Sequence, residues 1–205
     1  KAEGKTVPMF GLGWGPILDG SFLPYQPTDA AAIDIAKNVP MLVGSTKNEF
    51  TPFIPGSRDI TMENATINLQ KKYGDKTDAY IAAVKKTYPE TSKPSDYIDI
   101  DVFFRPGTIS HANLKAAPGA APVYMYLFSW QSPVMDGMYK AMHCMELPFV
   151  FNNIDKCEEM TGGGKEAYGV GLMFFEFLDL KIKRNATASI RKSQIISYTK
   201  TLKLC

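Results

Sequence analysis

Two short apolar runs constrain the fold of this chain more than any other feature. Residues 39–44 (VPMLVG) and residues 123–130 (VYMYLFSW) are continuous and apolar, without the alternation that marks a half-buried strand. Runs of this length predict strands that are buried on both faces, as in a parallel sheet. Because two strands do not make a stable doubly wound sheet, we expect this sequence to form part of a larger domain.

Helical patterns separate the two runs. The sequence predicts a short helix over 30–37, with Asp29 before it as a capping residue, and longer helices over 61–72 and 77–88, each capped by its threonine. A further helix over 95–117 is expected to break or kink where Arg-Pro-Gly stands at 105–107. The order strand, helices, strand predicts an α/β fold with a mostly parallel sheet flanked by helices.

The composition is that of a soluble globular protein, since 45% of the residues are hydrophobic and 21% are charged. No apolar run approaches the roughly 18 residues that cross a bilayer, so we expect no membrane span. The first residues lack the apolar core of a signal peptide. Because the chain starts at Lys1 rather than methionine, we expect that its true amino terminus is missing, which leaves secretion or a periplasmic location open.

The charge is unevenly distributed along the chain. Residues 179–205 hold seven Lys or Arg side chains and one acidic residue, a net charge of 7 − 1 = +6, whereas the preceding residues hold 16 basic and 20 acidic groups, a net charge of −4. We therefore divide the chain into a body, residues 1–168, and an atypical basic tail, residues 169–205. The tail lacks interleaved aromatics, so no nucleic-acid partner is expected, and two hypotheses remain open: a frameshifted ending or a disordered tail.

His143, one of two histidines, follows the second apolar run, and Glu49 follows the first. Since the carboxyl ends of parallel strands meet at one edge of a sheet, the fold can bring these two side chains together. A carboxylate on Nδ1 of an imidazole fixes its tautomer while Nε2 transfers a proton. The alternative is a loop histidine and a solvated glutamate.

Four segments resemble the carboxyl-terminal half of type-B carboxylesterases, the family of para-nitrobenzyl esterases and cholinesterases. They are GPILDGSFLP, VPMLVGSTKNEF, PVYMYLFSWQSP and MHCMELPFVFNN, and they occur in the same order from about Gly15 to about Asn153. The resemblance implies an α/β-hydrolase fold, a serine esterase mechanism with an acyl-enzyme, a small carboxylic ester as substrate and no cofactor. It also implies that Glu49 is the acid and His143 the base of a catalytic triad.

Three departures from the family pattern stand out. Phe50 follows the glutamate where many relatives have glycine, and Tyr139-Lys140-Ala141-Met142 precedes the histidine where small residues are usual. The Gly-x-Ser-x-Gly segment of the nucleophile and the Gly-rich oxyanion loop do not occur in the chain. We therefore expect the chain to need the missing amino-terminal half for activity. Two alternatives are a non-catalytic interaction module of the same fold and an inactive gene fragment.

Several other residues are candidates for roles at the same site. Glu146, three residues after His143, is predicted to support the site by hydrogen bonding rather than to bind a metal, and no metal site is predicted. Five aromatic residues are candidates for an apolar substrate pocket, with core packing as the alternative: Phe50, Phe53, Phe103, Phe104 and Trp130. His111 is expected at the surface or core edge of a helix, and Cys144 and Cys157 are expected to be free thiols.

Overall fold

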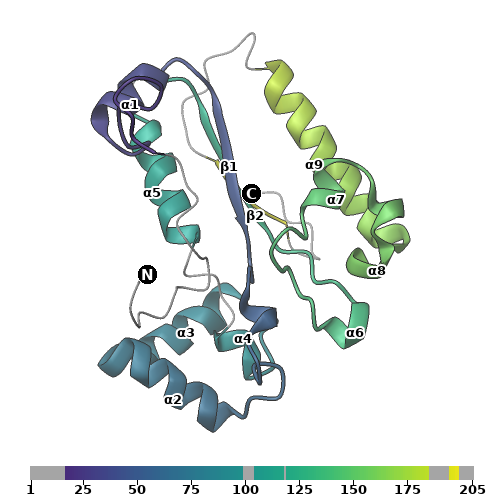
Figure 1. Cartoon of the computed structure of the whole chain (residues 1–205). Coiled ribbons are helices and arrows are strands. Elements are labelled where there is room, and N and C mark those ends of the chain that lie inside the picture. Colours follow the sequence, from purple (N-terminus) through teal and green to yellow (C-terminus); the bar gives the residue numbers. More distant parts are fainter. Residues whose placement is uncertain (1–16, 99–103, 118, 185–193, 199–205) are drawn as a thin grey trace, which may run out of the picture.

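A computed structural model describes residues 17–98, 104–117, 119–184 and 194–198 of the chain. Its sheet contains β1 (Met41–Thr46), β2 (Val123–Phe128) and β3 (Gln194–Tyr198), in the order β1-β2-β3 and all parallel (Figure 1). The two predicted strands and their parallel pairing are confirmed, while β3 in the basic tail was not predicted. Burial on both faces is confirmed for β2 but is wrong for β1, whose Leu42 is exposed. β1 begins at Met41 because Pro40, which has no N–H, lies just before it.

Helices cover both faces of the sheet. On one face α5 (Arg105–Lys115) packs against β1 and β2, and its Ala112 joins Val123 and Met125 in a small core. On the other face lies α9 (Gly164–Arg184), whose Phe174 ring centroid is 5.2 Å from that of Tyr126. The predicted arrangement of a parallel sheet flanked by helices is therefore confirmed (Figure 1).

Gly44 in β1 allows an aromatic ring to lie flat against the strand. A Cβ atom at this position would lie 2.5 Å from ring atoms of Tyr126, which no real side chain tolerates. The Tyr126 ring in turn contacts Phe174 of α9. The absence of a side chain at Gly44 therefore leaves room for Tyr126 to pack against both β1 and this helix.

A helical subdomain lies beyond the carboxyl ends of β1 and β2, as Figure 1 shows. It consists of α2 (Met62–Tyr73), the 3-10 turn η2 (Gly74–Lys76), α3 (Thr77–Thr87) and α4 (Ser95–Ile98) around a core of Leu69, Val84, Tyr88 and Tyr97. The predicted cap of α2 is confirmed, because the Thr61 side chain accepts a hydrogen bond from the Asn64 N–H. The predicted cap of α3 is wrong, because Thr77 already belongs to the helix and its hydroxyl donates to the carbonyl of Gly74.

Shorter elements connect these layers. Before the sheet lies α1 (Ala30–Ala36), close to the predicted range, and after β1 comes the 3-10 turn η1 (Thr51–Phe53). After β2 the chain forms α6 (Val134–Gly137), α7 (Leu147–Val150), the 3-10 turn η3 (Ile154–Lys156) and α8 (Glu158–Thr161). The break expected at 105–107 is a helix start, with Pro106 in the first turn of α5, where its missing N–H is tolerated.

The basic tail is described in part. Helix α9 continues across residue 168, where we place the end of the esterase-like body, and residues 185–193 and 199–205 lie outside the described residues. The frameshifted or disordered nature of the tail therefore stays a prediction. Among the helices of the described ranges, none has the length and apolarity that crossing a membrane requires.

Candidate active site

The loop after β1 positions Glu49 by local hydrogen bonds. The backbone N–H of Thr46 donates to Oε1 of Glu49 at 2.9 Å, and the backbone N–H of Glu49 donates to Oγ1 of Thr46 at 3.2 Å. Glu49 has a φ of 42°, in the left-handed region that residues other than glycine seldom adopt. Its side chain is nine-tenths buried, so this strained turn holds the carboxylate in one place with Oε2 still available.

The loop after β2 is bonded directly to this turn. The backbone N–H of Asn48 donates to the carbonyl of Ala141 at 3.1 Å, and Oδ1 of Asn48 accepts from the N–H of Ala141 at 3.0 Å. A further backbone bond joins the two loops, since the N–H of His143 donates to the carbonyl of Glu49 at 2.9 Å. The two loops are therefore connected through the backbone on both sides of the carboxylate.

This connection brings the predicted acid and histidine into contact. Nδ1 of His143 lies 2.6 Å from Oε2 of Glu49. An ionised carboxylate can only accept hydrogen bonds, so in the tautomer that bonds to it Nδ1 would carry the shared hydrogen and Nε2 the free lone pair. The imidazole side chain is 43% exposed and the carboxylate 9%, so the pair is buried on the acid side and open on the histidine side. Such an arrangement can accept a proton at Nε2 and stabilise the resulting imidazolium.

Glu146 lies near the pair without being bonded to it. Burial, followed by the charge of Glu49, raises the pKa of the Glu146 carboxyl, while His143 lowers it. Its Oε2 is buried and has no hydrogen-bond partner in the described structure. The same two carboxylates act on a neighbouring tyrosine: burial, then Glu146 and Glu49, raise the pKa of Tyr126 to about 12. The supporting role of Glu146 stays a prediction. Its carboxyl is half-buried and near the charge of Glu49.

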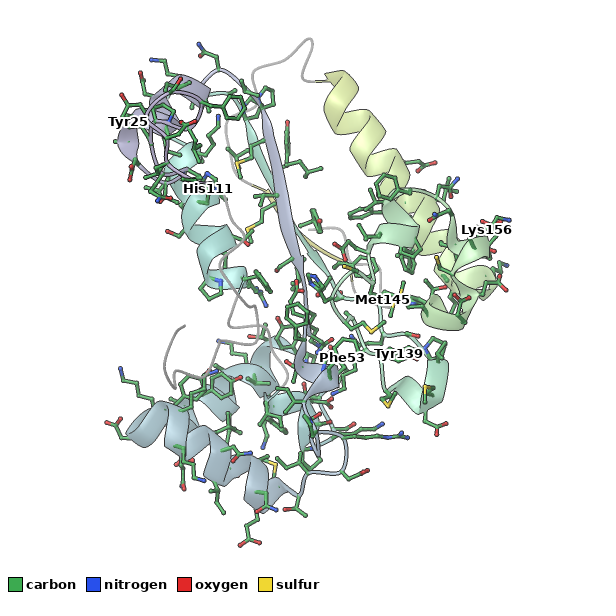
Figure 2. All side chains as sticks on the ribbon, in the orientation of Figure 1. Tyr25, Phe53, His111, Tyr139, Met145 and Lys156 are labelled. Carbon is green, nitrogen blue, oxygen red and sulfur yellow. The ribbon has the colours of Figure 1, made fainter. Side chains whose placement is uncertain are left out.

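The candidate pocket aromatics fall into three situations. Phe50 is half-buried, and its ring centroid lies 4.3 Å from that of His143. Phe104, just before α5, stacks 6.0 Å from the same imidazole. Phe53 is 58% exposed at the carboxyl edge of the sheet (Figure 2), and Trp130 is packed in the core with its indole N–H donating to the carbonyl of Thr161. Phe103 lies outside the described residues.

The other candidate residues are not hydrogen-bonded to the pair. His111 is half-buried on α5, on the other side of the sheet from the His143 loop (Figure 2). Cys144 and Cys157 are free thiols, and burial followed by the charges of Glu146 and Glu49 raises the pKa of Cys144. Within the described ranges, no group of three or more His, Cys, Asp or Glu side chains is arranged to hold a metal ion.

No serine hydroxyl of the described residues is hydrogen-bonded to His143. Ser132 uses its hydroxyl to donate to the carbonyl of Met160, and the hydroxyls of Ser45 and Ser129 are buried without a partner. None of them is bonded to His143. The described residues thus hold a carboxylate–imidazole pair at the carboxyl edge of a parallel sheet, the edge where α/β folds place their functional side chains.

Comparison with known proteins places the chain in one family. Residues 2–160 match the model of the carboxylesterase family. The chain is 33% identical over 161 residues to the para-nitrobenzyl esterase of Bacillus subtilis (strain 168), which covers 78% of this chain and 31% of that protein. It is 28% identical over 149 residues to the phenmedipham hydrolase of Pseudarthrobacter oxydans, covering 71% of this chain and 29% of that protein.

A solved structure agrees with this match. The crystal structure of the Geobacillus stearothermophilus carboxylesterase superposes with a TM-score of 0.53 and 26% identity, over 82% of this chain and 36% of that one. The chain belongs to the carboxylesterase family, and its fold is part of an α/β-hydrolase fold. It spans less than a third of the length of the curated relatives that it matches.

Proposed function

We propose that this chain is the part of a serine carboxylesterase that supplies the triad acid and base. His143 acts first as general base toward a serine hydroxyl and then as general acid toward the leaving alcohol, while Glu49 orients the imidazole and stabilises its protonated form. The single observation that supports this proposal is the 2.6 Å contact between Nδ1 of His143 and Oε2 of Glu49. The substrate class is a small carboxylic ester, as the family match suggests.

The nucleophile has to come from other residues than these. The sequence contains no Gly-x-Ser-x-Gly segment, and no serine hydroxyl of the described residues is bonded to His143. We therefore propose that the chain has no esterase activity alone and gains it when joined to a serine-bearing amino-terminal portion. The intact pair argues against a non-catalytic interaction module, because a strained turn and a buried carboxylate would serve no purpose there.

Hydrolysis of a short p-nitrophenyl ester tests both statements. The purified chain should show no turnover above that of buffer. Joined to the serine-bearing amino-terminal portion of a carboxylesterase, it should turn the ester over, and His143→Ala should lower kcat by about 10⁴- to 10⁶-fold, the range for loss of a triad member in serine hydrolases. His111→Ala is the matched control and should leave kcat unchanged, since His111 lies on α5, away from the pair.

Two results would contradict the proposal. Turnover by the chain alone that disappears in His143→Ala would show that no external serine is needed. Full activity of the His143→Ala variant in the joined protein would show that another group is the base.

A further inference from the structure

The imidazole of His143 has an aromatic ring against its face. The ring centroid of Phe50 lies 4.3 Å from that of His143, with an angle of 33° between the two planes. Phe104 contacts both rings, with its centroid 5.9 Å from that of Phe50 and 6.0 Å from that of His143. Three rings from three separate segments therefore form one aromatic cluster around the proposed base.

Phe50 is held in this cluster by its backbone. The carbonyl of the preceding residue, Glu49, accepts the N–H of His143 at 2.9 Å, so the peptide that carries Phe50 is attached to the histidine loop. Phe50 then turns the chain into η1, with φ and ψ of −86° and −4°. The half-buried ring has Phe104 as its second support, which leaves it little freedom to move away from the imidazole.

The Phe50 contact restricts rotation of the His143 ring, which the hydrogen bond to Glu49 opposes only in part. A histidine ring turns about its Cβ–Cγ bond in a broad, two-fold potential, and a half turn exchanges the positions of Nδ1 and Cδ2. The Oε2–Nδ1 hydrogen bond opposes this turn, but it is a single contact at the ring edge. A phenyl ring packed on the face of the imidazole opposes any rotation that would tilt the plane into it.

We propose that Phe50 is a positioning residue that holds the plane of the His143 imidazole, so that Nδ1 stays on Glu49 and Nε2 stays open. For its catalytic meaning this inference rests on the proposed esterase function. The imidazole plane is held by a phenylalanine that directly follows the acid in sequence. A glycine at this position would remove the contact.

Nitrogen-15 spectra of the imidazoles test the inference on the full 205-residue chain. With two histidines in the sequence, the spectrum contains four ring nitrogens, and His111 serves as an internal reference. His143 should show a protonated Nδ1 and an unprotonated Nε2. In Phe50→Leu the fraction of the opposite tautomer should rise by about two- to tenfold, the effect expected from loss of one aromatic contact.

Two further variants separate positioning from general damage. Phe50→Tyr keeps the ring and should retain the wild-type tautomer. Phe53→Leu is the matched control, since Phe53 is 58% exposed and three residues away, and it should change nothing. The backbone amide spectrum reports whether each variant is folded. If Phe50→Leu is unfolded, the decision passes to Phe50→Met, whose flexible side chain fills the site without an aromatic face.

The inference is overturned if folded Phe50→Leu or Phe50→Met keeps the wild-type tautomer ratio, or if Phe53→Leu changes it equally. In the joined enzyme, Phe50→Leu should lower kcat with little effect on KM, and Phe50→Tyr should restore it. Because the tautomer is measured without any ester turnover, failure of this inference is distinguishable from failure of the proposed function.

Discussion

The loop after β1 and the loop after β2 meet at one edge of the sheet, but they are built in different ways. Glu49 lies three residues after the end of β1, and its backbone N–H and Oε1 both form their hydrogen bonds with Thr46 of the same turn, while Oε2 contacts His143. His143 lies fifteen residues after the end of β2, and its loop contains four residues other than glycine with positive φ: Met135, Asp136, Lys140 and Cys144. The Glu49 carboxylate in the first loop is therefore placed largely by a neighbour in sequence.

The second loop depends on distant anchors. The Trp130 indole donates to the carbonyl of Thr161 and the Ser132 hydroxyl to that of Met160, while Nζ of Lys140 lies 2.9 Å from Asp96 at the edge of the helical subdomain. Burial of Asp96 raises the pKa of its carboxyl, but hydrogen bonds from Lys140 and the backbone of Lys93 more than offset this and lower the pKa overall. The comparison teaches that the acid is positioned locally and the base by tertiary contacts.

The largest loss of stability is expected from removing a hydrogen bond between the two loops. In Asn48→Ala the buried N–H of Ala141 loses its acceptor, and we expect a loss of about 2 kcal/mol in the free energy of unfolding. Urea unfolding followed by circular dichroism measures it. Asn38→Ala, on an exposed residue, is the matched control. A loss below about 0.5 kcal/mol, the range of ordinary surface substitutions, would mean that the loops are joined by other contacts.

A smaller effect is expected from removing one distant anchor of the second loop. Trp130→Phe keeps an aromatic ring in the core but removes the hydrogen bond to Thr161, which should cost about 1–2 kcal/mol. In Trp130→Phe, amide hydrogen exchange should be accelerated relative to wild type more at His143 than at Thr46, because the anchor supports the second loop and not the first. Equal acceleration at both amides would contradict the division between local and tertiary positioning.

The smallest effect is expected at Glu146, which follows His143 by three residues. Because burial and the charge of Glu49 raise the pKa of Glu146, the folded chain binds this proton more tightly than the unfolded chain. Stability from this group is present below the pKa of an unfolded glutamate and is lost as pH rises through the folded pKa. Solvent reaches the half-buried carboxyl, so Glu146→Gln should reduce the stability lost between about pH 4 and pH 7 by less than about 1 kcal/mol.

Urea unfolding of the wild type and of Glu146→Gln at both pH values measures this difference. Glu158→Gln is the control, because it removes one acidic charge from the same part of the chain outside the site. A wild-type loss of stability that the Glu146→Gln variant reproduces in full would place the responsible carboxyl elsewhere.

Much of the fold follows from local patterns along the chain. The two apolar runs predicted β1 and β2, Thr61 and Gly74 predicted the limits of α2, and the observed strands are parallel as expected. These features depend on residue neighbours, so they are visible without a structure. The third strand was missed, because residues 194–198 lie in a basic stretch of weak periodicity. The cap at Thr77 was misplaced, because the 3-10 turn η2 starts the helix earlier than the threonine pattern indicates.

The candidate site was predicted unevenly. Glu49 and His143 were expected to meet because parallel strands end at one edge, and the 2.6 Å contact agrees with that argument. The aromatic candidates could not be sorted from the sequence. Trp130 is a core residue, Phe53 lies at the surface, and Phe50 with Phe104 surrounds the imidazole. Their hydrophobicity is alike, so their places depend on which loop each side chain faces.

The sequence by itself determined the elements and the chemistry available in this chain: two parallel strands, an acid after the first, a histidine after the second, and no Gly-x-Ser-x-Gly segment. Only the tertiary structure decided the contacts that each carboxylate makes. Glu146 is three residues from His143 in sequence and its Oε2 stays without a partner, whereas Glu49 is 94 residues away and forms the bond. The physical reason is that backbone pairing between the two loops, and not proximity along the chain, sets the direction of both side chains.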